Sequence, residues 1–578
     1  MKQNSVELTD NLNVYLKGHS LTFGTHNELY SFKYSFVTPW NGRYAYSSID
    51  NFLAEKPSRV RGTFHFGDNS REYNQTNPSA EFRAWLLNFY VQDEFNLTPK
   101  LNVSAGLRLE TGVFPDQTNL SNDVTNTPEF SRFGTKIKSN IVLSPRLGFN
   151  WQLSENKTVQ LRGGSGVFSG RVPFAWFAYN YLYNGQQYGN VDIRPTTVVK
   201  QTLDIASLTN SQAVKREINL IDPNFKLPRV WRSNLALDMT LPKGFMLTIE
   251  GLYTKTLYDI RYQNLNLKPN VKQFTGNDNR DIYVGSGDAQ RINPQFTSVF
   301  LLTNTRQGYR YNLTTSLRKS FFNRINTSVS YNYGESKDVM NGVRVSHQAN
   351  WEWNQTTNVN TPALSYSNFD IRHKIAVFID YDHVWNKHLI SSLSVLYNGV
   401  SGSPFTYIYA GDYNRDGSST NDLVYIPTTG SELQYTDLKD ATGKIIATAA
   451  QQAQQFDDYI SQYDYLNKNR GKVSERNGGR TPWNHNLDLR LTQKIGLKGS
   501  QKIEITLDLI NFLNLINKAY GQQKFVPNTT NSGYQLLTYV SEVNGKPSFQ
   551  FNNPTTPPWQ IDPLASRWQG QLGLRFSF

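Results

Sequence analysis

The sequence predicts an all-β protein, an antiparallel transmembrane β-barrel with short periplasmic turns and long extracellular loops. Three observations favour this fold class. Apolar and polar residues alternate with a period of two along many segments. No run approaches the roughly 18 apolar residues that a membrane-spanning helix requires. Short turn segments and long polar segments follow each other in alternation along the chain.

The alternation is clearest in residues 101–109, 503–509 and 572–578. Successive side chains of a strand point to opposite faces, so each segment has one apolar and one polar face. Segments of about ten residues with this pattern, separated by turns, are typical of outer-membrane barrels. The apolar positions are Leu101, Val103, Ala105, Leu107, Leu109, Ile503, Ile505, Leu507, Leu509, Leu572, Leu574, Phe576 and Phe578.

The overall composition agrees with this fold but does not select it alone. Only 38% of the 578 residues are hydrophobic, and the mean hydropathy is −0.55. Barrels have such averages because every second strand residue and most loop residues are polar. Aromatic residues make up 13% of the chain, and Tyr and Trp suit the membrane–water boundary. A large soluble array of β-sandwiches would share this composition.

Charge and cysteine content narrow the function classes. The net charge is +13, but Lys and Arg are scattered without a run of five, so we expect no nucleic-acid partner. Acidic lipopolysaccharide head groups or an anionic solute are the expected contacts. The chain has no cysteine, which excludes disulfides, thiol catalysis and cysteine-based metal sites.

Seven short segments rich in Gly, Pro, Asn and Lys predict tight turns. Because bacterial barrels have short periplasmic turns and long extracellular loops, the lengths also predict orientation. The short turns lie at residues 17–18, 98–100, 155–157, 242–244, 321–323, 385–387 and 498–500. The long loops span residues 37–80, 112–138, 170–229, 266–297, 336–368, 410–483 and 515–566.

These connections predict about fifteen strands, two beside each short turn and one at the C-terminus. The first predicted strand runs toward the periplasm, whereas a complete single-chain barrel starts and ends there with an even number of strands. We therefore expect one partial barrel domain over residues 1–578, with an odd number of strands missing upstream. The alternative is one miscounted hairpin. No apolar stretch follows residues 1–5, so the sequence starts without a secretion signal.

Five motifs along the chain carry a family resemblance. Residues 88–95 (NFYVQDEF) with 107–110 (LRLE) match a YxQDE…GLRxE hairpin, and residues 144–149 (SPRLGF) match an SPRxGF strand. Residues 369–374 (FDIRHK) match a strand opening late in the same barrel. Further motifs occur at residues 480–483 (RTPW) and 487–490 (LDLR). In combination the motifs resemble TonB-dependent receptors, and the last two resemble the Oar-like subgroup of Bacteroidetes.

This resemblance implies an outer-membrane barrel of 22 strands. It also implies a plug domain in the lumen and a periplasmic TonB protein that pulls on the plug to admit substrate. With fifteen of the 22 strands in this chain, seven would be missing. Seven is an odd number, as the direction of the first predicted strand requires. Neither a plug sequence nor a TonB box is recognisable in residues 1–578, so both are expected elsewhere.

The expected function is uptake or binding of a solute too large for ordinary porins, with loops that capture it and a plug that gates it. A structural or adhesive barrel without active transport is the first alternative. A secreted soluble β-rich binding protein, which would need no detergent for extraction, is the second. An enzyme is not expected, since the histidines lack zinc or triad spacing. These histidines are His373, His383, His388 and His485.

The C-terminal segment resembles the signal that the barrel assembly machinery reads in bacterial outer-membrane proteins. It ends in an aromatic residue on the predicted lipid-facing register. A closing strand without a signal role would need the same pattern. The residues concerned are Trp568, Leu572, Leu574, Phe576 and Phe578.

Residues 412–422 resemble a calcium-binding loop. Carboxylate and amide oxygens at the first, third and fifth positions, with Gly417 at the sixth, are what a hard cation requires. The late acid comes one place early for an EF-hand, and an ion-free turn is the alternative. A bound calcium would rigidify the loop; no other cofactor is expected. The candidate ligands are Asp412, Asn414, Asp416, Ser418, Thr420 and Asp422.

Two further loop segments have predicted roles. Aromatic residues after position 170 build either a ligand-binding mouth or membrane-interface anchors, and the pattern favours neither. Residues 451–465 predict a short amphipathic helix that packs within the longest loop or covers it as a lid. The aromatic candidates are Trp176, Tyr179, Tyr181 and Tyr183.

Charged residues on the polar strand faces are expected to face the lumen. They would contact a plug or line a solute path, or else form a hydrated lattice of ion pairs. The residues are Arg108, Glu110, Asp238, Glu250, Asp380, Asp488, Arg490, Glu504 and Arg575.

Overall fold

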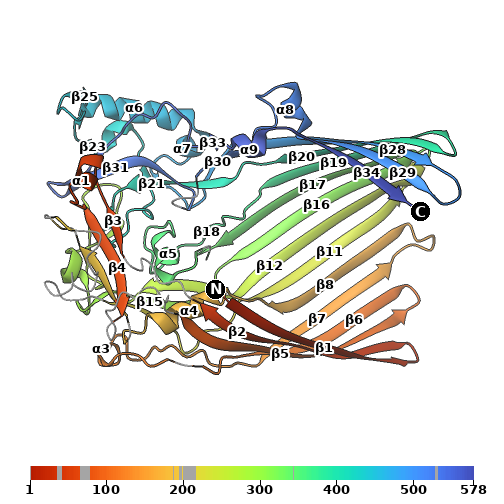
Figure 1. Ribbon diagram of the computed structural model, residues 1–578, viewed down its shortest axis with the longest axis horizontal. Coiled ribbons are helices and arrows are strands. Elements are labelled where there is room, and N and C mark those ends of the chain that lie inside the picture. The colour runs from red at the N-terminus through yellow and green to blue at the C-terminus, as the bar shows by residue number, and fades with distance from the viewer. Residues whose placement is uncertain are drawn as a thin grey trace.

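A wall of fifteen antiparallel strands dominates the computed structural model of the chain (Figure 1). The structure describes residues 2–34, 42–65, 79–116, 118–186, 188–193, 195, 198–199, 216–340, 342, 344–527 and 531–578. Each wall strand pairs with its neighbours in chain order. The wall strands are β1 (Lys2–Leu16), β2 (His19–Tyr34), β5 (Ala80–Thr98), β6 (Leu101–Val113), β7 (Val142–Gln152), β8 (Val159–Ser169), β11 (Arg229–Leu241), β12 (Phe245–Asn264), β16 (Tyr309–Phe321), β17 (Ile325–Asp338), β19 (His373–Asn386), β20 (Leu389–Val400), β28 (Asn484–Gly496), β29 (Lys502–Ile510) and β34 (Gln569–Ser577).

The predicted fold class and the predicted strand number are therefore confirmed. All seven predicted short turns join neighbouring wall strands at one end of the barrel, including the short 3-10 turn η2 (Pro242–Gly244). The seven long loops join them at the other end (Figure 1). Strand β1 leads into the first short turn, as the sequence predicted. By the rule for bacterial barrels, the short-turn end faces the periplasm.

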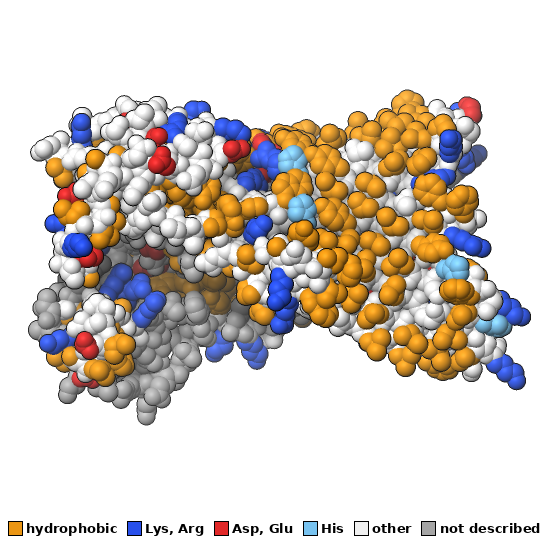
Figure 2. All heavy atoms as spheres, turned by 90° about the horizontal axis from the view of Figure 1, so that it is seen from above, with side chains coloured by type: hydrophobic (Ala, Val, Ile, Leu, Met, Phe, Trp, Pro, Cys, Tyr) orange, Lys and Arg blue, Asp and Glu red, His pale blue; other side chains and the backbone are white. Residues whose placement is uncertain are grey.

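The outer surface of the wall carries the apolar side of the alternation. In the β29–β34 pair, Leu507 lies opposite Leu572 and Ile505 opposite Leu574. All four side chains are exposed on the outside. Space-filling shows apolar side chains spread over the barrel half of the molecule, with charges concentrated toward its ends (Figure 2). Such a surface is stable in hydrocarbon, where each buried CH₂ contributes about 0.8 kcal/mol.

Aromatic rings gather at both edges of this apolar surface. Near the loop end, the His373 and Trp483 ring centroids lie 5.9 Å apart, and those of Trp483 and His485 lie 6.0 Å apart. Near the turn end, His383 and Trp385 lie 4.2 Å apart. Rings with a polar atom at one edge favour the membrane–water boundary. His373, His383 and His485 thus belong to two interfacial girdles.

The described parts of the long loops fold into an extracellular cap. Among the described residues, no helix is long and apolar enough to cross a membrane. The cap elements are β3 (Arg43–Ala45), α1 (Ile49–Leu53), β4 (Arg59–His65), α3 (Asn122–Thr125), α4 (Ala175–Leu182), β9 (Tyr188–Ile193), β10 (Arg216–Ile221), β13 (Val271–Gln273), β14 (Asp281–Tyr283), η3 (Gly287–Gln290), β15 (Phe296–Thr305), α5 (His347–Glu352), β18 (Ser365–Tyr366), β21 (Pro404–Ala410), β22 (Tyr425–Ile426), η4 (Gly430–Glu432), β23 (Gln434–Tyr435), β24 (Leu438–Lys439), β25 (Ile445–Ala447), α6 (Ala449–Gln462), α7 (Asp464–Lys468), β26 (Lys472–Val473), β27 (Gly479–Arg480), α8 (Phe512–Ile516), β30 (Lys524–Phe525), β31 (Gly533–Val543), β32 (Lys546–Gln550), β33 (Gln560–Ile561) and α9 (Pro563–Ser566).

Three apolar clusters of described residues hold the cap together, and the third of them joins α3, β10 and β15. The first fills the loop end of the lumen, where α4 packs on inward-facing rings of β2 and β5 such as Phe32 and Phe82. The second lies farther out, between β21, β31, β32 and α6. Packing within these clusters holds the loops of the cap in place.

Helix α6 confirms the amphipathic helix predicted near residues 451–465. Thr448 caps its start, and the Gln451 side chain reciprocates by accepting from the Thr448 backbone N–H. Its apolar face, with Phe456 and Ile460, is fully buried in the outer cluster. The helix therefore packs within the loop, as the first of the two predicted roles states.

The wall is open along one line. Among the described pairings, β1 pairs only with β2 and β34 only with β29. Each of these strands thus has one edge whose backbone N–H and C=O groups are not bonded to another wall strand. Hydrocarbon cannot satisfy such groups.

Candidate functional site

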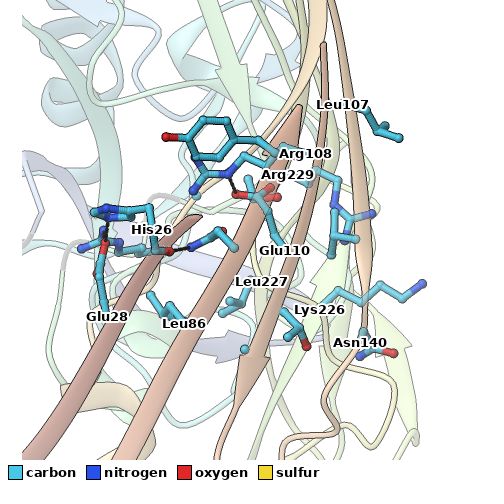
Figure 3. Close-up of a pocket in the computed structure, with 18 of the residues that line it drawn as sticks. His26, Glu28, Leu86, Leu107, Arg108, Glu110, Asn140, Lys226, Leu227 and Arg229 are labelled. Atoms are coloured by element: carbon cyan, nitrogen blue, oxygen red, sulfur yellow. Dashed lines mark hydrogen bonds and ion pairs between the residues drawn. The ribbon is translucent and has the colours of Figure 1, made fainter. Parts of the chain in front are cut away.

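A cavity of about 570 Å³ lies against the inner wall at the level where the strands meet the cap. We call it the lumen pocket. Strands β2, β5, β6 and β7 form its back, and the segment leading into β11 forms its side. Figure 3 shows Arg108 beside Glu110 and His26 beside Glu28, while Leu107 points away from them. The alternation explains this, since Leu107 is 41% exposed on the lipid face.

Two carboxylates of the lumen pocket are already paired. Glu110 binds Arg108 Nε at 2.8 Å and accepts a 2.8 Å hydrogen bond from Ser144. Glu28 is paired with Arg171 and lies 2.8 Å from Nε2 of His26. These pairs fix the side chains on the wall and cancel their charges.

Three further cations of the lumen pocket lie over aromatic rings. Among the described residues, no carboxylate lies within ion-pair distance of Arg146, Lys226 or Arg229. Arg146 lies over the Phe168 ring, 4.8 Å from its centroid. Lys226 lies 4.7 Å, and Arg229 5.4 Å, from the centroid of the Tyr258 ring. Ring faces attract cations but leave their positive charge in place.

The lumen pocket is therefore positively charged. Its lining has six cationic side chains and two carboxylates. Inside a low-dielectric wall, like charges gathered in this way focus a positive potential into the cavity. The cations are Arg108, Lys138, Arg146, Arg171, Lys226 and Arg229, and the carboxylates are Glu28 and Glu110.

Sequence reasoning identified part of this site. Arg108 and Glu110 were expected in the lumen from the alternation of β6, and they lie there. His26, Glu28 and Arg146 also lie on regular strands, so the same alternation could have identified them. Arg171, Lys226 and Arg229 come from the two ends of one long loop. No local pattern indicates that these ends converge.

Most other predicted lumen charges form ion pairs or hydrogen bonds across neighbouring strands. Arg162 Nε lies 2.8 Å from Asp238 and Arg162 Nη2 lies 3.4 Å from Glu250. Arg490 pairs with Asp508 at 2.5 Å. Asp380 accepts from Ser394 at 2.6 Å, Asp488 accepts from the Asn511 N–H, and Glu504 lies opposite Arg575 in register. Away from the lumen pocket, these contacts favour the alternative that the charges facing the lumen form a hydrated lattice of ion pairs.

The candidate calcium loop lies in the outer cap, directly after β21. Asn414, Asp416, Ser418 and Asp422 are each less than 5% exposed. Ser418 and Thr420 donate to the Glu352 carbonyl at 2.9 and 3.2 Å. The loop is thus packed against α5 rather than extended into solvent.

The carboxyl groups of this loop repel one another. Burial, and then the neighbouring Asp416, raises the pKa of Asp412 to about 7. Burial raises the pKa of Asp416 to about 6 and that of Asp422 well above its ordinary value. Among the described residues, no three His, Cys, Asp or Glu side chains converge closely enough to hold a metal between them. Calcium binding at this loop stays a prediction.

The aromatic candidates after residue 170 lie in the core. Trp176, Tyr179 and Tyr183 are each 5% exposed or less within the lumen cluster. The Tyr181 ring stacks on Phe82 with centroids 5.0 Å apart. The residues form α4, which turns its rings toward the wall and its neighbours. This burial in the cap does not agree with membrane-interface anchors, and a ligand-binding role stays a prediction.

The C-terminal candidates lie on the outside of β34. Leu572 and Leu574 are both 77% exposed, and Phe578 is 92% exposed. Trp568 and Phe576 are also exposed on the outside. This placement agrees with a lipid-facing strand, and the signal role stays a prediction.

Comparison with known proteins gives one family. The family described as "Outer membrane beta barrel domain" matches residues 1–541 of the chain. No curated protein matches the sequence.

Solved outer-membrane proteins resemble the chain at low identity. The FrpB iron transporter of Neisseria meningitidis is 10% identical over 89% of this chain and 51% of its own, with a TM-score of 0.39. A mutant ferric enterobactin receptor of Pseudomonas aeruginosa is 11% identical over 90% and 49%, with a TM-score of 0.42. The outer membrane transporter YddB of Escherichia coli is 10% identical over 89% and 50%, with a TM-score of 0.45. The chain spans about half the length of each.

Proposed function

The chain belongs to the outer-membrane β-barrel domain family and resides in the outer membrane, and we propose that it is the wall of a TonB-dependent receptor that takes up an anionic solute. Its motifs at residues 88–110 and 144–149 support the receptor assignment, because they resemble the barrel strands of that family. The Oar-like subgroup of Bacteroidetes is part of the same proposal.

The positive lumen pocket carries the proposal of an anionic solute. Arg146, Lys226 and Arg229 have no carboxylate partner among the described residues, and they lie beneath the cap on the inner wall. An anion that enters from the cap meets these cations before it reaches the lower wall, where cations are already paired, as Arg490 is. A site of this kind raises the local concentration of anions.

The whole receptor would contain more than this wall. We propose that seven further strands join the open edges of β1 and β34 to complete 22 strands, because lipid cannot satisfy these edges. A plug in the lumen, driven by periplasmic TonB, would gate the solute. The exposed apolar side chains of β34 would contact lipid and serve as the assembly signal, and the scattered surface cations would contact lipopolysaccharide.

Solute depletion from the growth medium tests this function. A strain carrying the full gene and a deletion strain grow in the same medium, and the remaining solutes are separated by charge. We expect the first strain alone to deplete an anionic fraction, and a protonophore to stop depletion. The double variant Arg146→Glu, Arg229→Glu should lose at least tenfold in depletion rate, since charge reversal repels the anion.

Lys498→Glu is the matched control, because it reverses a charge in a periplasmic turn far from the lumen pocket. It should deplete the medium like the wild type. Equal depletion by all strains would contradict uptake and favour a structural or adhesive barrel. Depletion that continues under the protonophore would contradict TonB coupling.

A further inference from the structure

We propose that residues 412–422 bind a calcium ion, and that the ion fixes this loop against three neighbouring extracellular loops. Asp412, Asn414 and Asp416 are the principal side-chain ligands. The proposal is independent of transport, because it concerns the outer cap rather than the lumen pocket.

Backbone contacts already arrange the loop around its side-chain oxygens. The Gly417 N–H donates to Asp412 Oδ2 at 2.9 Å, and the Ser418 N–H donates to Asp416 Oδ1 at 2.8 Å. Gly417 has φ +99°, a conformation that glycine adopts without strain. The other oxygen of Asp412, Oδ1, is buried and has no hydrogen-bond partner in the described part of the chain. This oxygen is free to bind a cation.

Two fully buried side chains at the end of the loop also have an oxygen that is free to bind a cation. Asn421 and Asp422 are both 0% exposed, and Oδ1 of each lacks a hydrogen-bond partner among the described residues. Asn421 donates its amide to Asp416 Oδ2 at 2.9 Å, which places it against the acidic residues. Asp422 Oδ2 accepts from the Tyr413 N–H at 2.8 Å. Buried oxygens without a donor are rare in folded proteins and destabilise them.

Protein cations only partly balance the three carboxylates: Arg280 lowers the pKa of Asp422, but burial keeps that pKa well above its ordinary value. Among the described residues, no ion pair involves Asp412, Asp416 or Asp422. The nearby Arg280 is paired with Asp278 at 2.9 Å and lies over the Tyr413 ring at 4.8 Å. Arg415 points to Glu542, at 3.0 Å. Buried charges need a partner, and a divalent cation would supply two positive charges at once.

The ligand chemistry selects calcium. All candidate ligands are oxygens, and calcium accepts irregular sets of six to eight oxygens, whereas magnesium requires a near-octahedral set. Because no three described acidic side chains converge on one point, the Asn414 amide and backbone carbonyls would complete the set. Extracellular calcium modules bind with dissociation constants of about 10⁻⁴–10⁻³ M.

The position of the loop explains what binding would do. The Tyr283 N–H donates to the Asn414 carbonyl at 2.9 Å, from the loop after β12. Ser418 donates to the Glu352 carbonyl, from the loop after β17. Arg415 pairs with Glu542, from the loop before β34. An ion that fixes residues 412–422 therefore braces four loops together.

Terbium and calcium titrations of the full-length protein in detergent test the site. Terbium should luminesce on tyrosine excitation, because Tyr413 lies in the loop, and calcium should displace it. At a calcium concentration ten times the dissociation constant, proteolysis between residues 410 and 423 should slow by about tenfold. Absence of both effects in the wild-type protein would overturn the proposal.

Asp412→Asn and Asp416→Asn should abolish both effects. The matched control is Asp440→Asn, which removes a carboxylate from an exposed turn of the same long loop; it should behave like the wild type. In chelator, Asp412→Asn should resist protease at least as well as the wild type, because one repelling charge is gone. In calcium it should resist less. Equal protection of Asp412→Asn and the wild type by calcium would refute the site.

Discussion

His347 in α5 is a buried imidazole without a charged partner. It is 0% exposed, and neither ring nitrogen has a hydrogen-bond partner among the residues that the structure describes. Its ring packs edge-on against Tyr262, with centroids 4.9 Å apart. Burial disfavours the charged form and lowers the pKa of His347 to about 3. The cap therefore holds this histidine in its neutral form.

Protonation of His347 by itself destabilises the cap in acid, whereas the raised pKa values of Asp412, Asp416 and Asp422 act in the opposite direction. The unfolded chain binds a proton at His347 below its ordinary pKa of about 6.5, whereas the folded chain resists it down to about 3. The stabilising contribution is complete above about pH 6.5 and is lost as the pH falls toward 3. Since each pKa unit corresponds to about 1.4 kcal/mol, the loss reaches several kcal/mol.

Thermal melting of the detergent-solubilised protein at about pH 4 and pH 7 measures this effect. His347→Phe keeps the ring volume and removes the proton site, so its melting temperature should fall less between the two pH values. His388→Phe, in an exposed periplasmic turn, should fall as much as the wild type. A loss in His347→Phe as large as in the wild type would contradict the assignment.

At the scale of elements, the two faces of a wall strand should respond oppositely to charge. Leu491 of β28 faces lipid between Leu393 and Leu507, and is 46% exposed on the outside. Its neighbour Thr492 faces the lumen beside Ser392 and Thr506. Leu491→Arg should cost about 2–4 kcal/mol, because the charge enters the bilayer.

Thr492→Arg is the matched control, since its side chain enters the hydrated lumen and should change stability little. Urea unfolding of both variants in lipid vesicles measures the difference. Equal destabilisation of the two variants would contradict the assigned faces.

Strand elements were predictable because their pattern is local. A wall strand contacts lipid on its outer face and water on its inner face. Its alternation of apolar and polar residues reflects both environments, as in Leu107 and Arg108. The cap was not predictable in the same way. Strands β21 and β31 pair in parallel, with Tyr407 opposite Tyr534, and no turn or period connects residues so far apart. Helix α6 is the cap element that was predictable, because its amphipathic pattern lies within its own residues.

The candidate site likewise contains residues that a local pattern predicts and residues that no local pattern predicts. Arg108 and Glu110 follow from the alternation of β6. Lys226 and Arg229 could not be assigned, because their place depends on where a long loop returns to the wall. The aromatic residues of α4 show a related limit of local pattern: a run of rings predicts burial in some apolar environment, and in the structure that environment is the cap core.

At the scale of the whole molecule, the absence of cysteine makes the orientation directly testable. Lys444→Cys places a thiol in an exposed cap turn, and Asn156→Cys places one in an exposed short turn. A membrane-impermeant maleimide should label Lys444→Cys on intact cells. It should label Asn156→Cys at least tenfold less until the outer membrane is permeabilised, because that turn faces the periplasm. The reverse labelling would invert the assigned orientation.

The wall and the cap also differ in when their contacts can form during folding. Every wall strand pairs with its neighbour in chain order, so hairpins can form one after another as the chain arrives. The cap joins distant segments, such as Lys272 and Glu542, 270 residues apart. Closing such long loops is entropically costly and slow. Wall hairpins can therefore form from the strands already present, although the wall is complete only with β34, whereas the contacts of the outer cap also need segments far apart in the chain.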